Sequence, residues 1–385
     1  MTKHAILSAS SAHRWLTCTA SALLEQEFPD SSSEAAAEGT LAHEMCELKV
    51  SNALVKKMVK ATFTRKMNAL RKHELYQLEM EGYTDAYLDY VFGVYTAFDE
   101  APYIAVEKHV DFSAYVPEGF GTCDCVMIYG NEMDIIDFKY GKGVPVSAEN
   151  NPQLRLYALG ALLEYSMLWD IETITMHIVQ PRLNSISTEI LTKDELLLWA
   201  DEVKIIAAEA MIGNGVFSPS EEACRFCRAK ATCRARAEKN LELAQHDFKK
   251  PPVLSDLEVG QILEKAQDLK AWASDLEEYA LKTLLAGGSI PGYKAVEGRS
   301  NRAFADQDKA FEILIAGGVE EALLYERKPL TLAKVEKLVG KKDFAEMVGD
   351  YVIKPPGKPA LAPESDKREA ITLRSTAEED FSKEE

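Results

Sequence analysis

The stretch GTCDCVMIYGNEMDIIDFKY, residues 121–140, decides the fold of this chain. Its two apolar runs meet at Gly130-Asn131, a dipeptide that suits a two-residue turn between antiparallel strands. If the turn consists of those two residues, Tyr129 pairs with Glu132. The stretch therefore predicts a β-hairpin, and the turn fixes the register of every pair behind it.

This register brings three charged side chains together. Counting back from the turn places Asp124 opposite Asp137, and the strand period places Lys139 on the same face. The apolar neighbours on that face are Val126, Ile128, Met133 and Ile135. Two facing carboxylates repel each other unless a cation lies between them, and oxygen ligands suit Mg²⁺ or Mn²⁺. The alternative is an ordinary surface hairpin with an Asp–Lys salt bridge.

The flanking sequence predicts further strands and helices. Residues 103–112 and 172–182 are rich in β-branched and aromatic residues, which favours strands. Helices are expected over residues 34–50, parts of 52–100, 151–165, 193–211 and 255–285. Their start signals are a Ser31–Glu34 capping box for the first, Asn151 with Pro152 for the third, and Thr192 for the fourth. The fold class expected is α/β (α+β), with a central mixed sheet flanked by helices.

Length and composition set the outline. The 385 residues suffice for two or three domains, with 46% hydrophobic and 28% charged residues. We expect a first domain over residues 1–245, a mainly helical domain over 246–350 with a turn- and strand-like segment at 287–306, and a proline-rich, acidic tail over 351–385. No apolar run is long enough to span a membrane, and the first residues lack a signal-peptide core, so a cytoplasmic location is expected.

Cysteines form a second distinctive pattern. The segment CRFCRAKATC carries Cys224, Cys227 and Cys233 within ten residues. Reduced cytoplasmic thiols favour metal binding over disulfides, and zinc or iron–sulfur sites usually take four protein ligands. The segment alone leaves the fourth ligand open. The net charge of −18 argues against a general electrostatic grip on nucleic acid, although basic residues concentrate around these cysteines.

The charged hairpin resembles the signature of the PD-(D/E)XK nucleases. Asp124 in GTCD, followed by Asp137 and Lys139 in DFK, matches that pattern. The helix after the hairpin supplies a QxxxY motif in Gln153 and Tyr157. The early segment GTLAH, which ends at His43, is similar to the G-x-x-x-H motif of the RecB-type branch. This resemblance covers residues 1–240 and implies a restriction-endonuclease-like sheet.

The resemblance implies a role for each motif residue in hydrolysing a phosphodiester with Mg²⁺ or Mn²⁺. The metal ligands would be His43, Asp124, Asp137 and the backbone carbonyl of Phe138. Lys139 would act on the nucleophile or the phosphate, held by Gln153 and Tyr157. Glu107, on the preceding strand, would help to position the site from outside the ligand set. The plainer alternatives are a His43 packed against Glu47 and a half-buried helix face at Gln153 and Tyr157.

Some RecB-type nucleases, including AddB subunits and CRISPR-adaptation nucleases, hold a [4Fe–4S] cluster with one upstream cysteine and three downstream in the spacing C-x2-C-x5-C. Cys224, Cys227 and Cys233 match the downstream spacing, and the resemblance makes Cys18 the upstream ligand. Such a cluster would clasp the N-terminal segment to the end of the nuclease core. Zinc is the alternative metal for four cysteines.

The resemblance also extends to a biological setting. The whole chain looks like phage- and prophage-encoded proteins, which implies a DNA exonuclease in recombination or DNA processing in the bacterial host cytoplasm. A strand-annealing or single-strand-binding protein would be its partner, and a homo-oligomer is compatible with that role. The candidate DNA-contacting residues are Arg225, Arg228, Arg234, Lys294, Arg299 and Arg302. The alternatives are a catalytically silent DNA-binding protein and a zinc-organised interaction protein.

Overall fold

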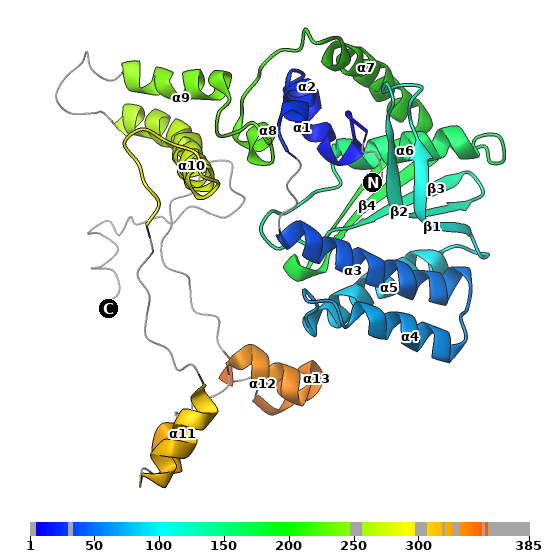
Figure 1. Cartoon of the computed structure of the whole chain (residues 1–385). Coiled ribbons are helices and arrows are strands. Elements are labelled where there is room, and N and C mark those ends of the chain that lie inside the picture. The colour runs from blue at the N-terminus through cyan, green and yellow to red at the C-terminus, as the bar shows by residue number, and fades with distance from the viewer. Residues whose placement is uncertain are drawn as a thin grey trace, which may run out of the picture. The chain divides into compact units, whose positions relative to one another are not determined.

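The fold is built around a mixed β-sheet (Figure 1). The computed structural model describes residues 5–29, 34–246, 256–296, 306–317, 320–325, 331–348 and 351–352. Within them the sheet has five strands in the order β1-β2-β3-β4-β5, with β3 and β4 parallel and the other neighbours antiparallel. The strands are β1 (Tyr103–Asp111), β2 (Phe120–Tyr129), β3 (Glu132–Phe138), β4 (Thr173–Gln180) and β5 (Ser185–Thr192). The expected α+β class with a central mixed sheet is confirmed.

The predicted hairpin between β2 and β3 is confirmed in its register. Tyr129 pairs with Glu132, and the pairing continues to Cys125 opposite Ile136. Gly130 in the turn has a φ of +59°, which glycine adopts without the steric penalty of a Cβ atom. The next pair in this register is the one that the site prediction requires, Asp124 opposite Asp137.

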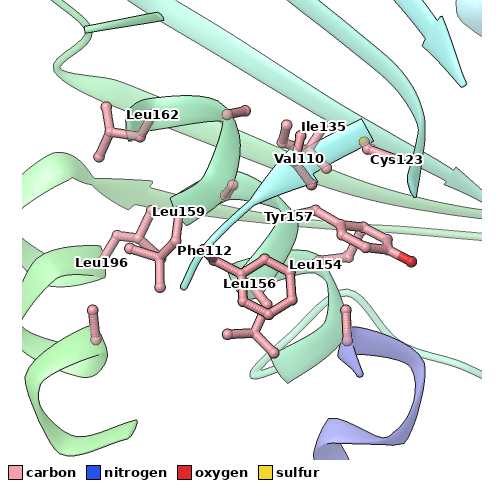
Figure 2. Close-up of a cluster of buried hydrophobic side chains, with 14 of the residues drawn as sticks. Val110, Phe112, Cys123, Ile135, Leu154, Leu156, Tyr157, Leu159, Leu162 and Leu196 are labelled. Carbon is pink, nitrogen blue, oxygen red and sulfur yellow. The ribbon is translucent and has the colours of Figure 1, made fainter. Parts of the chain in front are cut away.

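Helix α6 (Pro152–Tyr165) makes the crossover between the parallel strands β3 and β4. The side chain of Asn151 accepts hydrogen bonds from the backbone N–H groups of Gln153 at 3.0 Å and Leu154 at 3.3 Å, which confirms the predicted cap. Most side chains of α6 are buried, because the helix lies between the sheet and α7 (Lys193–Ile212). We call this core the α6-side cluster; its members include Val110, Cys123, Val126, Ile135, Leu154, Tyr157 and Leu196 (Figure 2).

Three helices cover the opposite face of the sheet: α3 (Glu34–Val50), α4 (Lys60–Leu70) and α5 (Glu79–Ala97) (Figure 1). The helix expected within residues 52–100 is thus two helices, and a π-helical turn at Ser51–Val55 ends the first of the three. Their apolar side chains form a second core, the α3-side cluster. Its members include Met45, Tyr87, Cys125, Met127 and Phe138.

Strand β5 was not predicted from the sequence. Four of its eight residues are serine or threonine, so the apolar signal is weak, and its side chains alternate between half-buried and exposed. Thr192 ends the strand and begins α7 with a capping box. The backbone N–H of Glu195 donates to the Thr192 side chain, and the Glu195 carboxylate accepts from the backbone N–H of Thr192, as predicted for this cap.

The N-terminal segment docks against the chain that follows α7. This segment holds α1 (Ala12–Thr17) and α2 (Ser21–Leu24), and the docking site leads into α8 (Glu221–Arg225). The backbone N–H of Val216 donates to Thr19 Oγ1 at 2.7 Å, and the N–H of Ala20 donates to the Val216 carbonyl at 3.3 Å. A Cβ atom on Gly215 would lie 2.4 Å from the Ala20 nitrogen, so glycine is what permits this close approach. Two segments almost two hundred residues apart are thereby fastened together.

The chain divides into two compact units at Met1–Pro291 and Gly292–Glu385. This differs from the predicted boundary after residue 245, because α9 (Arg234–His246) and α10 (Asp256–Leu285) pack together through a buried ion pair. The Arg236 guanidinium, 2% exposed, donates to Asp268 at 3.0 Å and to Asp275 at 2.6 Å. The predicted long helix at 255–285 is confirmed, but it belongs to the first unit.

The second unit is helical where it is described, as predicted, with α11 (Gln307–Ala316), α12 (Leu332–Val339) and α13 (Lys341–Val348). In the segment expected to be turn- and strand-like, residues 287–296 form turns without a strand. Ser31, Arg299, Arg302 and the tail from residue 353 lie outside the described residues. Among the described helices, none is both long and apolar enough to cross a membrane.

Candidate metal centre and cysteine pocket

The motif residues from four distant parts of the sequence meet near the middle of β2 and the end of β3. His43 comes from α3, on one face of the sheet, and its ring contacts Phe138 edge-on with centroids 5.2 Å apart. Its Nδ1 lies 3.3 Å from Asp124 Oδ1. The second oxygen of Asp124 accepts a hydrogen bond of 2.7 Å from the backbone N–H of Phe138. The predicted neighbours His43, Asp124 and Phe138 are therefore in direct contact.

Asp137 and Lys139 form the second half of the site. Asp137 is 2% exposed, and its Oδ2 lies 3.0 Å from Lys139 Nζ. The two atoms are not aligned as a hydrogen bond, and no other donor among the described residues reaches this buried oxygen. A buried carboxylate oxygen without a hydrogen bond is costly in a folded protein. A cation would satisfy it.

Lys139 is held in place from the opposite face by α6. Its ammonium donates to Gln153 Oε1 at 2.9 Å, and Gln153 Nε2 donates to the Tyr157 hydroxyl at 3.0 Å. The spacing of four residues puts Gln153 and Tyr157 on one side of the helix, as the sequence predicted. Gly121 on β2 leaves the space for the Tyr157 ring, since a Cβ atom there would lie 2.7 Å from it.

Glu107 belongs to the same cluster, although the sequence suggested a place outside it. Ligand atoms of His43, Glu107 and Asp124 all lie within 4.8 Å of one another, which is close enough to share one ion. Glu107 also has a φ of +49°, a left-handed conformation that costs a residue with a side chain about 1–2 kcal/mol. Backbone strain of this kind concentrates at functional sites.

The strained residue lies where the β1–β2 pair rotates. On the hairpin side of Asp124, Cys125 packs in the α3-side cluster, whereas Cys123, beyond it, packs in the α6-side cluster. Strict alternation would keep these two cysteines on one face. The predicted placement of Asp124 on the face of Val126 therefore needs correction: the rotation turns its carboxylate toward His43, on the α3 side.

Burial and like charges shift the acids of the site in different directions. Burial raises the pKa of Asp137, and the charge of Asp124 raises it further against the opposing effect of Lys139. Burial also acts on Asp124, but the charge and hydrogen bond of His43, with the Phe138 amide, lower its pKa below the ordinary value. Burial and the charge of Asp124 raise the pKa of Glu107 to about 7. Among the described residues, the site thus places three carboxyl groups beside only two side chains that can carry positive charge, His43 and Lys139.

These residues fit a divalent cation. Two carboxylates and one imidazole, from Glu107, Asp124 and His43, lie within reach of one ion. The predicted ligand Asp137 is not within 4.8 Å of all three, but its buried Oδ2 lacks a hydrogen bond and its pKa responds to the charges of Asp124 and His43. Carboxylate and carbonyl oxygens are the ligands that Mg²⁺ and Mn²⁺ prefer, and imidazole adds transition-metal affinity.

A second candidate site is a pocket lined by all four predicted cysteines, Cys18, Cys224, Cys227 and Cys233. None of the four forms a disulfide. The backbone N–H of Ser218 donates a hydrogen bond to the Cys18 sulfur at 3.4 Å. Burial raises the pKa of Cys227 to about 12, so the thiolate needs a partner cation to form at neutral pH. The fourth cysteine that the sequence segment left open is thus beside the other three.

Hydrogen bonds lock the walls of this pocket together. Glu25, 6% exposed, accepts from the Arg14 side chain at 2.6 Å and from the backbone N–H of Arg228 at 2.8 Å. Arg14 also donates to the Phe226 carbonyl at 3.1 Å. These hydrogen bonds attach the N-terminal segment to the cysteine segment without a metal ion.

The sulfur atoms of the pocket are spread more widely than the ligands of one zinc ion. In the part of the chain that the structure describes, no three of these sulfurs lie within 4.8 Å of one another, whereas the His43, Glu107 and Asp124 atoms do. A tetrahedral zinc site with Zn–S bonds of about 2.3 Å separates its sulfurs by roughly 3.8 Å. A zinc ion would therefore require these side chains to move toward one another.

Of the basic residues expected to contact DNA, the structure describes four. Arg225 pairs with Glu221 at 3.0 Å, Arg234 is exposed at the start of α9, and Arg228 has its backbone N–H bound by Glu25. Lys294 is exposed in the second unit. Their role in binding DNA remains a prediction.

Comparison with known proteins places the chain in a family. Residues 4–369 match the family described as "Protein of unknown function (DUF2800)", and the chain belongs to it. A solved structure described as "Crystal structure of SSO0001" is similar to this chain at 15% identity, covering 56% of this chain and 95% of that one, with a TM-score of 0.24. An overlap this loose carries no argument about fold or activity.

Gly121→Ala tests the support of Lys139. The added Cβ would overlap the Tyr157 ring, so we expect the free energy of unfolding to fall by about 1–3 kcal/mol in chemical denaturation. Gly93→Ala, in the interior of α5 with open space around it, is the matched control and should stabilise the protein by about 1 kcal/mol. Equal effects of the two substitutions would contradict the close packing at Gly121.

Proposed function

We propose that this protein is a metal-dependent DNA nuclease that hydrolyses phosphodiester bonds. The observation that carries the proposal is the convergence of His43, Glu107 and Asp124, whose ligand atoms lie within 4.8 Å of one another. Asp137 belongs to the same group of interacting charges, and its Oδ2 has an ion-pair contact with the Lys139 ammonium but no hydrogen bond. The PD-(D/E)XK resemblance of the same residues supports this chemistry. A structural ion pair would account for Asp137 and Lys139 alone, but not for the strained Glu107 and the histidine from another layer.

The acidic residues and His43 would hold Mg²⁺ or Mn²⁺. Asp124, Asp137 and His43 are the principal ligands in this proposal, with the Phe138 carbonyl completing the set and Glu107 as an added ligand. A bound ion of this type supplies an activated water and neutralises charge on the phosphate. Such an ion would also relieve the repulsion by Asp124 that, together with burial, raises the pKa of Asp137.

Lys139 would stabilise the negative charge that develops on the phosphate during the reaction. An ammonium aimed at a transition state is effective when it is held rigidly in a site of low dielectric constant. Gln153 holds Lys139 by a hydrogen bond of 2.9 Å, and Tyr157 orients Gln153 in turn. In this proposal Lys139 contacts the substrate, and Gln153 and Tyr157 position it.

The four-cysteine pocket would hold a [4Fe–4S] cluster with a structural role. Its sulfurs come from Cys18 at one end of the core and from the segment 224–233 at the other. Closing a loop of this length restricts the unfolded chain, by roughly 4–5 kcal/mol if the cluster acts like a cross-link. Zinc remains the alternative metal, and the preference for the cluster rests on the resemblance in cysteine spacing.

The finer assignments rest on the resemblance. The resemblance alone supports four further parts of the proposal: exonuclease action, a role in phage recombination, a strand-annealing or single-strand-binding partner, and a homo-oligomeric state. Cleavage of 5′- and 3′-labelled single- and double-stranded DNA over time would establish polarity and strand preference.

Asp137→Asn should abolish nuclease activity. The change removes a charge that the proposed ion needs, with almost no change in shape, so we expect at least a 1,000-fold loss of DNA cleavage in Mn²⁺, equivalent to about 4 kcal/mol. Glu132→Gln, an exposed position on the same strand, is the matched control and should cleave like wild type. Equal cleavage by wild type and Asp137→Asn would refute the catalytic assignment.

Cys18→Ser should remove the metal from the cysteine pocket. We expect anaerobically purified wild type to contain iron and acid-labile sulfide and to absorb visible light, and the variant to lose most of both, together with thermal stability. Cys46→Ser, at a buried cysteine of the α3-side cluster, should keep the iron content of wild type. A colourless wild type with stoichiometric zinc would overturn the iron–sulfur assignment.

A further inference from the structure

The β1–β2 strand pair continues beyond the candidate metal centre, and its end carries two aromatic rings. His109 pairs across the strands with Thr122, and Asp111 pairs with Phe120. The His109 and Phe120 rings stack with centroids 5.4 Å apart and planes inclined by 23°. His109 and Thr122 are exposed, and Phe120 is half-buried. The pair therefore presents an aromatic surface to solvent.

This surface lies on the same side of the sheet as His43. Lys108 and Gly121 occupy the alternate positions of the two strands, and both contact α6. His109 directly follows Lys108, and Phe120 directly precedes Gly121. Because side chains alternate along a strand, His109 and Phe120 point to the opposite face. That face is the one from which α3 brings His43 to Asp124.

The ring pair is also close to the metal ligands along the strand. His109 follows Glu107 by two residues, which is about 7 Å at the rise of a β-strand. A nucleotide whose phosphate lies at Glu107 and Asp124 can bring its neighbour's base over such a surface. On β2, Thr122 lies between Asp124 and Phe120, and its small exposed side chain leaves room for the nucleotide.

Stacking is a suitable way for this protein to bind DNA. Its net charge of −18 weakens any general attraction for phosphates, whereas the attraction between an aromatic side chain and a base does not depend on that charge. Bases in a duplex are already paired and stacked on one another. A surface ring pair therefore selects bases that are unpaired.

We propose that the His109–Phe120 ring pair binds an unpaired base next to the phosphate held at the metal centre, so that the substrate is single-stranded DNA or a single-stranded end. This inference rests on the proposed nuclease function, which supplies the neighbouring phosphate. A cross-strand ring pair also stabilises the end of a sheet, so the test separates binding from folding.

Binding is measured with the full chain carrying Lys139→Met, which should prevent cleavage and leaves the proposed metal ligands in place. A labelled oligothymidylate is titrated in Mg²⁺ by fluorescence anisotropy, and each variant is melted in parallel. His109→Ala and Phe120→Leu should each weaken binding by about 10-fold, and Phe120→Trp should restore it. Tyr129→Leu is the matched control, because its ring pairs with Phe98 at 5.5 Å at the other end of the same strand.

A scan with abasic oligonucleotides locates the base. One abasic position should weaken binding to the Lys139→Met protein by about 10-fold, and the same position should have no effect once Phe120 is leucine. Binding of a blunt duplex should change less than twofold in either ring variant.

The outcomes separate the subsite from the nuclease proposal. A flat abasic scan, or equal weakening by Tyr129→Leu, overturns the subsite while Asp137-dependent cleavage by the wild type still stands. No binding of the oligonucleotide by folded protein overturns the subsite and also counts against the nuclease. A ring-dependent effect confined to one base position supports the subsite.

Discussion

Buried carboxylates of like charge are the constraint on which this structure depends. Asp124 and Asp137 lie on neighbouring strands at the edge of two apolar clusters, and burial there raises the pKa of Asp137 while Asp124 repels it. The chain balances this charge with one ammonium and one imidazole, and one Asp137 oxygen still lacks a hydrogen bond. A globular protein without a use for this arrangement would gain stability by replacing it with apolar residues.

The helices on both faces of the sheet contribute side chains to the candidate metal centre. From one face α3 provides His43, and from the other α6 provides Gln153, which holds Lys139. The rotation of β1 and β2 at Glu107 turns Asp124 toward the histidine, at the cost of a strained backbone. Away from the site, the N-terminal segment reaches the cysteine segment through Glu25 and Gly215, and the four cysteines line one pocket there. The N-terminal segment thus connects to the chain that follows α7.

Much of this was readable from the sequence because it depends on local rules. A two-residue turn fixed the register of Asp124 and Asp137, and helical spacing placed Gln153 beside Tyr157. Glu107 was harder, because β1 joins β2 through a longer connection from which no register can be counted, and no local signal announces a residue with positive φ. Strand β5 lacks an apolar run, and the attachment of α10 depends on Arg236 meeting two aspartates far along the chain. Long-range packing, not local preference, decided each of these.

The central claim is that the carboxylates of Glu107, Asp124 and Asp137 bind a divalent cation. The most direct measurement counts bound Mn²⁺ by electron paramagnetic resonance as the ion is titrated into metal-free protein, beside Asp124→Asn. We predict that wild type binds Mn²⁺ at this site and that the variant loses the binding while keeping its melting temperature, because the asparagine side chain still accepts the Phe138 N–H. Wild-type protein that binds no Mn²⁺, or a variant that binds it equally well, would contradict the account.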